Sequence, residues 1–124
     1  MTIGKINLEI FKCVSDDITT DEVVITERQL AHIKARHPQD YKLYSEFIPE
    51  ILKNPDYILE ANKPNSAVLL KEIVSHGDRV QLVIRFKVST DPADYKNSII
   101  TFMKIRRKEW NRLIKNKKIL YSVM

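Results

Sequence analysis

The decapeptide RVQLVIRFKV at positions 79–88 carries the clearest structural pattern in the chain. Its even positions are all apolar, whereas charged or amide side chains occupy most of its odd positions. Strict alternation is typical of a β-strand that buries one face and leaves the other to solvent or to a ligand. We therefore expect a strand over 79–88 that buries Val80, Leu82, Ile84 and Phe86.

Alternating segments recur on both sides of this strand, and short polar turns separate them. The turn at 75–78 contains Gly77, which can supply the positive φ that a tight turn needs. Further strands are expected at 57–60, 67–74, 98–105 and 118–122, with a basic helix at 106–115. Consecutive strands joined by short turns pair in antiparallel fashion, so this half of the chain predicts an antiparallel meander.

The segment before the meander begins with extended patterns and continues with helical ones. Alternation predicts one strand over 3–14, or a strand with a break. The apolar run at 23–25 predicts a short strand or an extended lead-in to the helix. Thr26 with Gln29 three residues later marks a helix start. That helix should end near residue 37, because Pro38 disfavours the helical conformation at the residue before it.

A second helix is expected at 41–53, with Asp40 as its cap. Its apolar face contains Leu43, Phe47, Ile51 and Leu52. Pro49 lies inside this pattern and should kink the helix or split it. Helices followed by a meander indicate an α+β fold: N-terminal helices packed on a four-stranded antiparallel sheet, in one domain over 1–124.

Composition excludes several classes of site. The chain has 124 residues, 21 Lys and Arg against 16 Asp and Glu, and a net charge of +5. Its two glycines cannot form a Gly-rich phosphate loop. Its single cysteine, Cys13, excludes an internal disulfide and a multi-cysteine zinc site, and the histidines lack zinc-binding spacing, so no metal or other cofactor is expected.

The location and partner follow from the same composition. The N-terminal stretch lacks the long apolar core of a signal peptide, and no apolar run approaches the ~18 residues of a transmembrane helix. We therefore expect a cytoplasmic protein that does not interact with membranes. The excess of positive charge favours an anionic partner such as RNA.

The helix expected over 26–37 carries the densest group of candidate functional residues. At about 100° per residue, one stripe contains Arg28, His32 and Arg36, and a second, apolar stripe contains His37. The two histidines are then roughly 140° apart and cannot both point into one pocket. His37 is either a packed structural histidine or a packed acid/base, and His32 is either a solvated residue or part of a phosphate-binding stripe.

Further candidates lie in the C-terminal half. Lys71 occupies an otherwise apolar strand face, where it reaches toward solvent, lies at an edge of the sheet or lines a site. Thr101 lies between apolar residues and is either a simple β-former or a functional hydroxyl. Basic residues at 104–118 alternate with Trp110 and precede Tyr121, which suits either a solvated helix face or contacts to RNA.

Several motifs occur in an order that is similar to a known family. These are ITER at 25–28, HI at 32–33, RHP at 36–38, NPDYI at 54–58, Lys71, YKNSIIT at 95–101 and KKILY at 117–121. Over about 20–122 the sequence resembles the phage-associated members of the barnase–EndoU–colicin–RelE-like (BECR) nuclease superfamily, the PBECR domains. The resemblance implies helices on a four-stranded antiparallel sheet, as the residue patterns also predict.

The resemblance also implies a function and a set of site residues. The function is a metal-independent ribonuclease of phage or prophage origin, acting by general acid/base transesterification on RNA, with transfer RNA among its targets, and restrained as a toxin by a neutralising protein. The implied catalytic residues are His37 or His32 as acid/base, Arg36 and Lys71 as charge stabilisers, and Thr101 as a positioning hydroxyl. The expected substrate-binding residues are Arg28, Ser98, Lys104 and Tyr121. The alternatives are a non-catalytic RNA-binding module and a phage structural or accessory protein.

Overall fold

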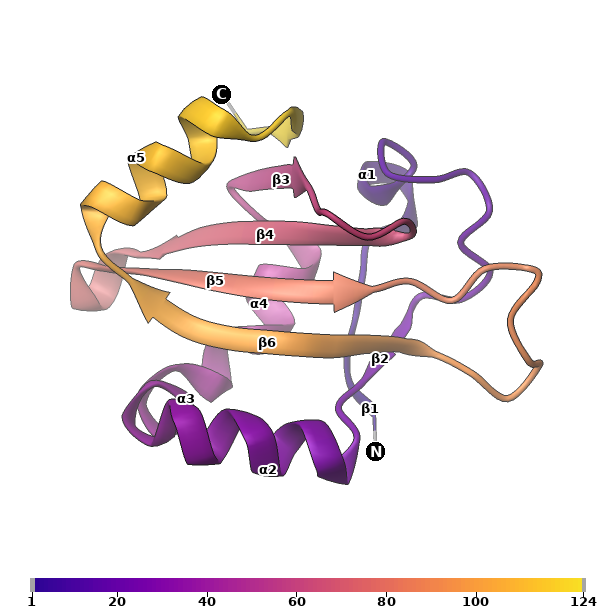
Figure 1. The fold of residues 1–124 in the computed structure, drawn as a ribbon, viewed down its shortest axis with the longest axis horizontal. Helices are drawn as coiled ribbons and strands as arrows, with labels where there is room; N and C mark the ends of the chain where they lie inside the picture. Colours follow the sequence, from indigo (N-terminus) through magenta and orange to yellow (C-terminus); the bar gives the residue numbers. More distant parts are fainter. Residues whose placement is uncertain (1, 124) are drawn as a thin grey trace.

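The computed structural model describes residues 2–123, which form helices around one mixed β-sheet (Figure 1). Within these residues the sheet has seven strands, in the spatial order β1-β2-β6-β5-β4-β3-β7. The strands are β1 (Thr2–Lys5), β2 (Glu22–Val24), β3 (Tyr57–Glu60), β4 (Ser66–Ile73), β5 (Asp78–Arg85), β6 (Asn97–Ile105) and β7 (Ile119–Ser122). The helices are α1 (Leu8–Phe11), α2 (Glu27–Arg36), α3 (Pro38–Tyr44), α4 (Ile48–Lys53) and α5 (Arg107–Asn116), with 3-10 turns η1 (Ser45–Phe47) and η2 (Val74–His76). The expected α+β class is confirmed.

The meander β3-β4-β5-β6 has the pairing that the alternation predicts. Val80, Leu82, Ile84 and Phe86 are all fully buried, as expected. The ladder of β5 ends at Arg85 and not at residue 88, although Phe86 stays buried beyond it. Gly77 has a φ of +66° and closes the turn before β5.

Helix α2 begins where the sequence predicts. The backbone N–H of Gln29 donates to the Thr26 hydroxyl at 3.1 Å, which caps the helix. The helix expected at 41–53 begins earlier, at Pro38, and is interrupted by η1, so Pro49 lies in the first turn of α4. Among the described residues, no helix combines the length and apolar character that crossing a membrane requires.

Two details of the second helix were predicted wrongly. Asp40 does not cap it, because its carboxylate instead accepts a hydrogen bond from the backbone N–H of Lys104 at 3.0 Å. Leu43 is 48% exposed, whereas Ile51 and Leu52 are buried. The interruption at η1 separates α3 from α4, so these residues no longer share one helical face.

The strand expected within 3–14 extends only to Lys5. Asn7 then caps α1, because its side chain accepts a hydrogen bond from the N–H of Glu9 at 3.1 Å. This single helical turn brings Phe11 into the core, where its ring centroid lies 5.5 Å from that of Phe86. The alternation of apolar residues over 6–10 therefore resembles a strand pattern, but the cap at Asn7 starts a helix there instead.

The expected four-stranded antiparallel sheet is wrong in size and in direction. Strand β2 pairs in parallel with β6, through Val23 with Asn97 and Val24 with Ser98. Strand β1 extends that edge, and β7 pairs with β3 at the opposite edge. The extra pairings join segments that are far apart in sequence, so local alternation does not reveal them.

Asn97 holds the parallel junction together. Its side chain is fully buried, and its amide N–H groups donate to the carbonyls of Thr20 at 2.8 Å and Glu22 at 3.0 Å. Its side-chain oxygen accepts from the N–H of Lys87 at 2.8 Å. A satisfied buried amide of this kind specifies one register, because any shift would leave polar groups unpaired. The junction places α2, which follows β2, beside β6.

The two faces of the sheet differ in how they are covered. The face that carries Leu82, here called the inner face, packs against residues of α1 to α4 in the main core. On the opposite, outer face, α5 contributes Trp110, Leu113 and Ile114 to a smaller apolar cluster. In Figure 1 α4 lies behind the sheet, α2 lies below β6, and α5 rises at one end of the strands. Part of the outer face therefore remains uncovered.

Candidate functional site

A hollow of about 650 Å³ lies between α2 and β6. It is lined by Arg28, Gln29, Ala31, His32, Ile100 and Thr101, and we call it the α2–β6 hollow. Three of the residues singled out from the sequence, Arg28, His32 and Thr101, therefore meet in one place. They come from segments far apart in the chain, which the parallel β2–β6 junction brings together.

Local structure explains how these side chains reach the hollow. Arg28 and His32 are one helical turn apart on α2 and share a face. In β6 the register shifts between the partners of Val83 and Ile84, so Ile100 is an extra residue in the ladder. Bulges of this kind redirect neighbouring side chains. Thr101 is the partner of Val83, and both belong to the outer face.

Three polar groups in the hollow have no partner among the described residues. Among residues 2–123, the side chains of Arg28, His32 and Thr101 make no hydrogen bond or ion pair, and both Arg28 and His32 are exposed. No carboxylate belongs to the described residues that line the hollow. A cation, an imidazole and a hydroxyl that remain unpaired in one concave site are available to an anionic ligand.

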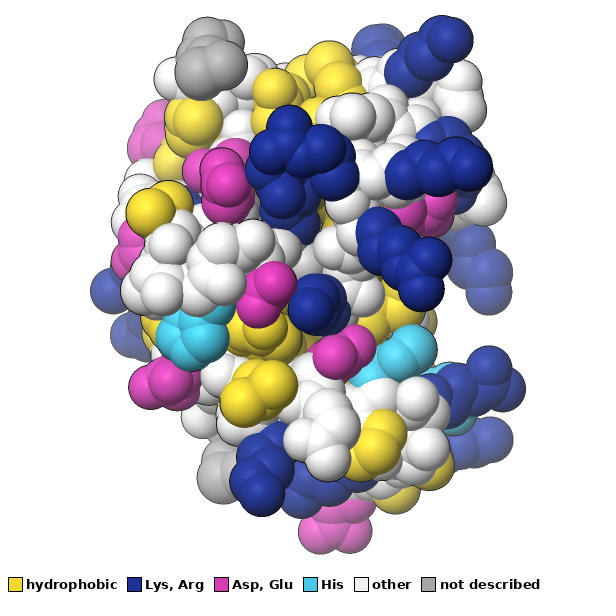
Figure 2. Space-filling model, turned by 90° about the vertical axis from the view of Figure 1, so that its left-hand side faces the viewer, with side chains coloured by type: hydrophobic (Ala, Val, Ile, Leu, Met, Phe, Trp, Pro, Cys, Tyr) yellow, Lys and Arg dark blue, Asp and Glu magenta, His cyan; other side chains and the backbone are white. Residues whose placement is uncertain are grey.

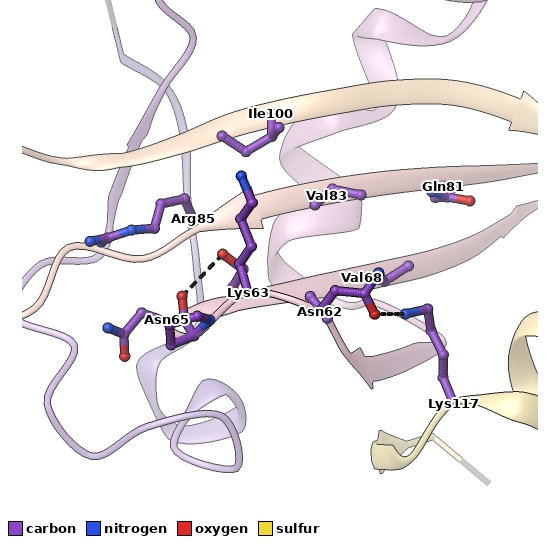
Figure 3. A pocket seen from close by; sticks show the side chains of 12 residues that line it. Asn62, Lys63, Asn65, Val68, Gln81, Val83, Arg85, Ile100 and Lys117 are labelled. Carbon is purple, nitrogen blue, oxygen red and sulfur yellow. Dashed lines mark hydrogen bonds between the residues drawn. The ribbon is translucent and has the colours of Figure 1, made fainter.

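A second concave surface continues from the hollow across the outer face. This outer groove, of about 700 Å³, lies between the β3–β4 loop, the strands β4 to β6 and the residue that follows α5. Figure 3 shows Lys63 extending from the loop over the groove toward Ile100. Lys117 closes one end and donates to the side-chain oxygen of Asn62 at 3.3 Å. Ile100 lines both the groove and the hollow, so the two surfaces are contiguous.

Arg85 also lines the groove, but its charge is already paired. Its guanidinium donates two hydrogen bonds to Asp91, at 2.8 and 3.0 Å, and Asp91 also accepts from the N–H of Val88 at 2.9 Å. The hydrogen bonds from Arg85 hold the pKa of Asp91 below its usual value, and those to Asp91 raise the pKa of Arg85. Arg85 therefore anchors the loop that follows β5.

A separate polar group lies where β5 begins and β6 ends; we call it the sheet-end cluster, formed by His37, Asp40, Tyr44, Asp78 and Lys104. His37 Nδ1 lies 3.8 Å from an oxygen of Asp40, and Lys104 Nζ lies 3.4 Å from an oxygen of Asp78. The buried Tyr44 donates its phenolic hydrogen bond to Asp78. Figure 2 shows this end of the molecule, with histidine surfaces on both sides of neighbouring acidic and basic side chains.

The contact between the Tyr44 phenol and the Asp78 carboxylate shifts the pKa values of both groups. The hydrogen bond to Asp78, together with burial, raises the pKa of Tyr44 to about 12. The same hydrogen bond lowers the pKa of Asp78, and Lys104 adds to that effect. Each polar group here already has a partner, so the cluster joins α3 to the ends of β5 and β6 and offers few free groups to a ligand.

The remaining candidates lie outside the hollow. Lys71 is 18% exposed, and its ammonium donates to the carbonyl of Asn54 at 2.7 Å and to Asp56 at 3.4 Å. Arg36 is exposed at the end of α2, and Ser98 lies opposite Arg85 in the ladder. Tyr121 is half-buried in β7, against the main core.

Sequence reasoning missed the residues of the outer groove. Gln81, Val83 and Ile100 form part of its surface, and the β3–β4 loop contributes Lys63. The alternation over 79–88 did contain a usable signal, because it assigns Gln81 and Val83 to the face opposite the core. The location of the uncovered area could not be inferred, because it depends on how far α5 extends over the sheet. Among residues 2–123, no three His, Cys, Asp or Glu side chains form a group that could hold a metal ion.

Comparison with known proteins identifies the family. Residues 2–122 match the family model described as phage-Barnase-EndoU-ColicinE5/D-RelE like nuclease 2, PBECR2. The match covers nearly the whole chain, so this protein belongs to that phage-associated nuclease family, and the resemblance read from the sequence is confirmed. It begins at residue 2 and so includes β1 and α1, which precede the region of that resemblance. No curated protein and no solved structure matches the chain.

Proposed function

We propose that this member of the PBECR2 family is an endoribonuclease that cuts RNA in the cytoplasm without a metal ion, at the α2–β6 hollow. The observation that carries the proposal is the meeting of Arg28, His32 and Thr101, none of which is paired within residues 2–123. The nuclease family supports the reaction class. The net charge of +5 supports an anionic polymer as substrate.

The three side chains supply most of what RNA transesterification requires. The His32 imidazole removes the proton from the ribose 2′-hydroxyl, whose oxygen forms a bond to the adjacent phosphorus. Arg28 stabilises the negative charge that develops on the phosphoryl oxygens, and the Thr101 hydroxyl donates a hydrogen bond to one of them. The bond from phosphorus to the 5′-oxygen then breaks, and water supplies the proton to that oxygen. The products are a 2′,3′-cyclic phosphate and a 5′-hydroxyl end.

His32 is favoured over His37 as the base because of its surroundings. His32 lines the hollow together with Arg28 and Thr101, whose side chains have no partner among residues 2–123. His37 lies beside Asp40, whose carboxylate would repel a phosphate group. The packed position that the sequence suggested for His37 is only partly realised, since its side chain is 33% exposed.

The test is an assay of the purified protein on total bacterial RNA, with and without EDTA. We expect discrete fragments with cyclic phosphate ends, unchanged by EDTA. A single 2′-deoxy substitution at a mapped cleavage site should abolish cleavage there, because it removes the attacking oxygen. Cleavage that survives this substitution would disprove the transesterification mechanism.

The same assay separates the two other functions. RNA that binds but is never cut would indicate a non-catalytic RNA-binding module. Absence of both binding and cleavage would favour a structural or accessory role in the phage. Co-expression with neighbouring genes of the same phage, scored by rescue of cell growth, would test for a neutralising partner.

A further inference from the structure

The α2–β6 hollow lies between two connections that join the helical segment to β6. At one end, β2 pairs with the start of β6, and α2 begins three residues after β2. At the other end, Asp40 in α3 accepts a hydrogen bond from the backbone N–H of Lys104, near the end of β6, at 3.0 Å. The lining residues of α2, at 28–32, and of β6, at 100–101, lie between these connections along each element. The two connections therefore frame the hollow.

Asp40 is placed to fix the end of α2. Helix α2 ends at Arg36 and α3 begins at Pro38, so the carboxylate of Asp40 lies in the turn that directly follows α2. The pairing of β6 with β2 ends at Ser98, and β5 pairs with the other edge of β6. Asp40 thus supplies the acceptor that the N–H of Lys104 requires. A carboxylate accepts a stronger hydrogen bond than a neutral group, so this contact holds α3 against β6.

Aromatic packing supports the same connection. The Tyr41 ring of α3 meets the buried Phe102 ring of β6 edge-on, with 6.5 Å between the ring centroids. Lys34 Nζ of α2 lies 5.4 Å from the centroid of the same Tyr41 ring. In Figure 1 α3 lies at the end of α2, below the end of β6. Helix α3 therefore bridges α2 and the part of β6 that carries Thr101, the residue before Phe102.

We propose that Asp40 is a positioning residue for the reaction in the hollow: its hydrogen bond to Lys104 sets the distance between the groups on α2 and the Thr101 hydroxyl on β6. This inference rests on the proposed ribonuclease function. Arg28 and His32 belong to one helix and move together, whereas Thr101 belongs to the strand. Only a fixed spacing between helix and strand lets all three act on one phosphate group.

Loss of this hydrogen bond should lower kcat more than it changes KM. Thr101 lies midway between Ser98 and Lys104 in β6, so a shift of about 2 Å at Lys104 becomes about 1 Å at Thr101. A misplacement of about 1 Å can cost about 10²-fold in rate, and the aromatic contacts should limit the loss to about tenfold. Arg28 and His32 can still bind the phosphate group, because their spacing on α2 does not change.

The experiment compares Asp40→Ala with Asp40→Asn in the full chain. Both substitutions remove the charge, but only asparagine keeps an oxygen that can accept from the N–H of Lys104. Asp40→Ala should lower kcat on a defined RNA by about tenfold with KM within about threefold, and Asp40→Asn should restore kcat to within about threefold of the wild-type value. Nuclear magnetic resonance without RNA should show shifted His32 and Thr101 signals in Asp40→Ala only.

The matched control is Asp56→Ala. Asp56 accepts from the backbone N–H of Glu72 at 2.8 Å and lies 3.4 Å from Lys71 Nζ. Its side chain is 24% exposed, against 23% for Asp40, and it is not among the described residues that line the hollow. Asp56→Ala should lose about as much stability as Asp40→Ala, since each loses one hydrogen bond from a backbone N–H, but its kcat should stay within about twofold.

The outcomes separate the positioning role from the proposed reaction. Unmoved His32 and Thr101 signals in Asp40→Ala, with full kcat, would overturn the inference even though the wild-type protein cleaves RNA. Equal losses of kcat in Asp40→Ala and Asp40→Asn would overturn it as well, because the lost charge would then be the cause. An equal loss in Asp56→Ala would reduce the effect to general destabilisation. Signals that shift in Asp40→Ala only, in a protein that never cleaves RNA, would support the spacing role and overturn the ribonuclease.

Discussion

Two regions of this molecule each contain a histidine, a cation and a hydroxyl. Among the described residues, these groups are unpaired in one region and paired in the other. In the α2–β6 hollow, Arg28, His32 and Thr101 have no partner among residues 2–123. In the sheet-end cluster, Asp78 accepts a hydrogen bond from Tyr44 and lies next to Lys104. The same residue types are thus left free in one region and paired in the other.

The difference shows that pairing, and not residue type, separates groups that hold the fold from groups that can bind a ligand. Groups paired with one another stabilise the elements that carry them, here α3 and the ends of β5 and β6. Unpaired groups in a concave site contribute little to folding and can exchange water for a ligand. His32 and His37 are only five positions apart, yet they belong to different regions, because α2 ends between them.

The largest expected effect separates the two histidines by activity. His32→Gln should lower the rate of RNA cleavage by about 10²–10⁴-fold, the usual contribution of a general base. His37→Gln should lower it by less than about threefold, because the His37 side chain pairs with Asp40 of the sheet-end cluster and does not line the α2–β6 hollow. The measurement is the cleavage rate of each variant on one defined RNA. The melting temperature of each variant shows whether it is folded.

A greater loss of activity in His37→Gln than in His32→Gln would contradict the distinction between the sheet-end cluster and the α2–β6 hollow. A large loss in His37→Gln, with His32→Gln active and both variants folded, would make the sheet-end cluster the reaction centre. His32 is exposed on α2, so its substitution should move the melting temperature by only a few degrees.

The second prediction concerns stability at the sheet-end cluster. Tyr44→Phe should lower the free energy of unfolding by about 1.5–3 kcal/mol, because it removes a buried hydrogen bond to a carboxylate. Urea denaturation at pH 7 measures this change. The matched control is Tyr41→Phe, whose lost hydroxyl has no hydrogen-bond partner among residues 2–123 and which should cost less than about 0.5 kcal/mol. Equal losses in the two variants would contradict the assigned role of Tyr44.

The third prediction concerns how the stability contributed by the Tyr44–Asp78 hydrogen bond depends on pH, and its expected effect is smaller. The pKa of Tyr44 is raised from 10.0 to about 12, so its neutral form is favoured by folding. This contribution is complete below pH 10 and is lost as the pH rises toward 12. The pKa of Asp78 is lowered from 3.8, so its contribution is present above that pH and is lost as the pH falls through its folded value. In Tyr44→Phe the alkaline loss should become smaller, as urea midpoints from pH 3 to 11 would show.

The smallest expected effect concerns Arg36, which lies beyond the hollow on the same face of α2. If RNA phosphates extend along this stripe, Arg36→Ala should weaken binding of uncleavable RNA by two- to fivefold at low salt. The slope of log affinity against log salt should become shallower by about 0.7, the value for one phosphate contact on a single strand. An unchanged slope would limit the phosphate contacts on α2 to the hollow itself.

The sequence predicted the elements whose stability is local. The alternation over 79–88 identified the central strand and its buried residues, and Thr26 with Gln29 identified the start of α2. It also predicted correctly that His32 and His37 would not share one pocket. Periodicity and capping act over a few residues, so one sequence is sufficient to detect them.

The parts of the fold and of the candidate site that the sequence did not predict depend on contacts between distant segments. The parallel pairing of β2 with β6 and the role of Asn97 require residues 20–24 to meet residues 87 and 97, which no local pattern encodes. The candidate site depends on this pairing, because it brings α2 beside Thr101. The sequence therefore singled out Arg28, His32 and Thr101, but it did not show that these three would meet in one hollow.

The late position of β6 in the chain also determines when the hollow can form. During synthesis, α2 leaves the ribosome long before Thr101 has been added, and the β2–β6 pairing must wait for β5 and β6. Pairings between distant segments also form slowly. A growing chain should therefore lack a complete hollow until β6 has been made. Under the proposed ribonuclease function, it should leave its own messenger RNA uncut until then. Chains stalled on the ribosome before and after Asn97–Ile105 emerges, assayed for cleavage of added RNA, would reveal this delay.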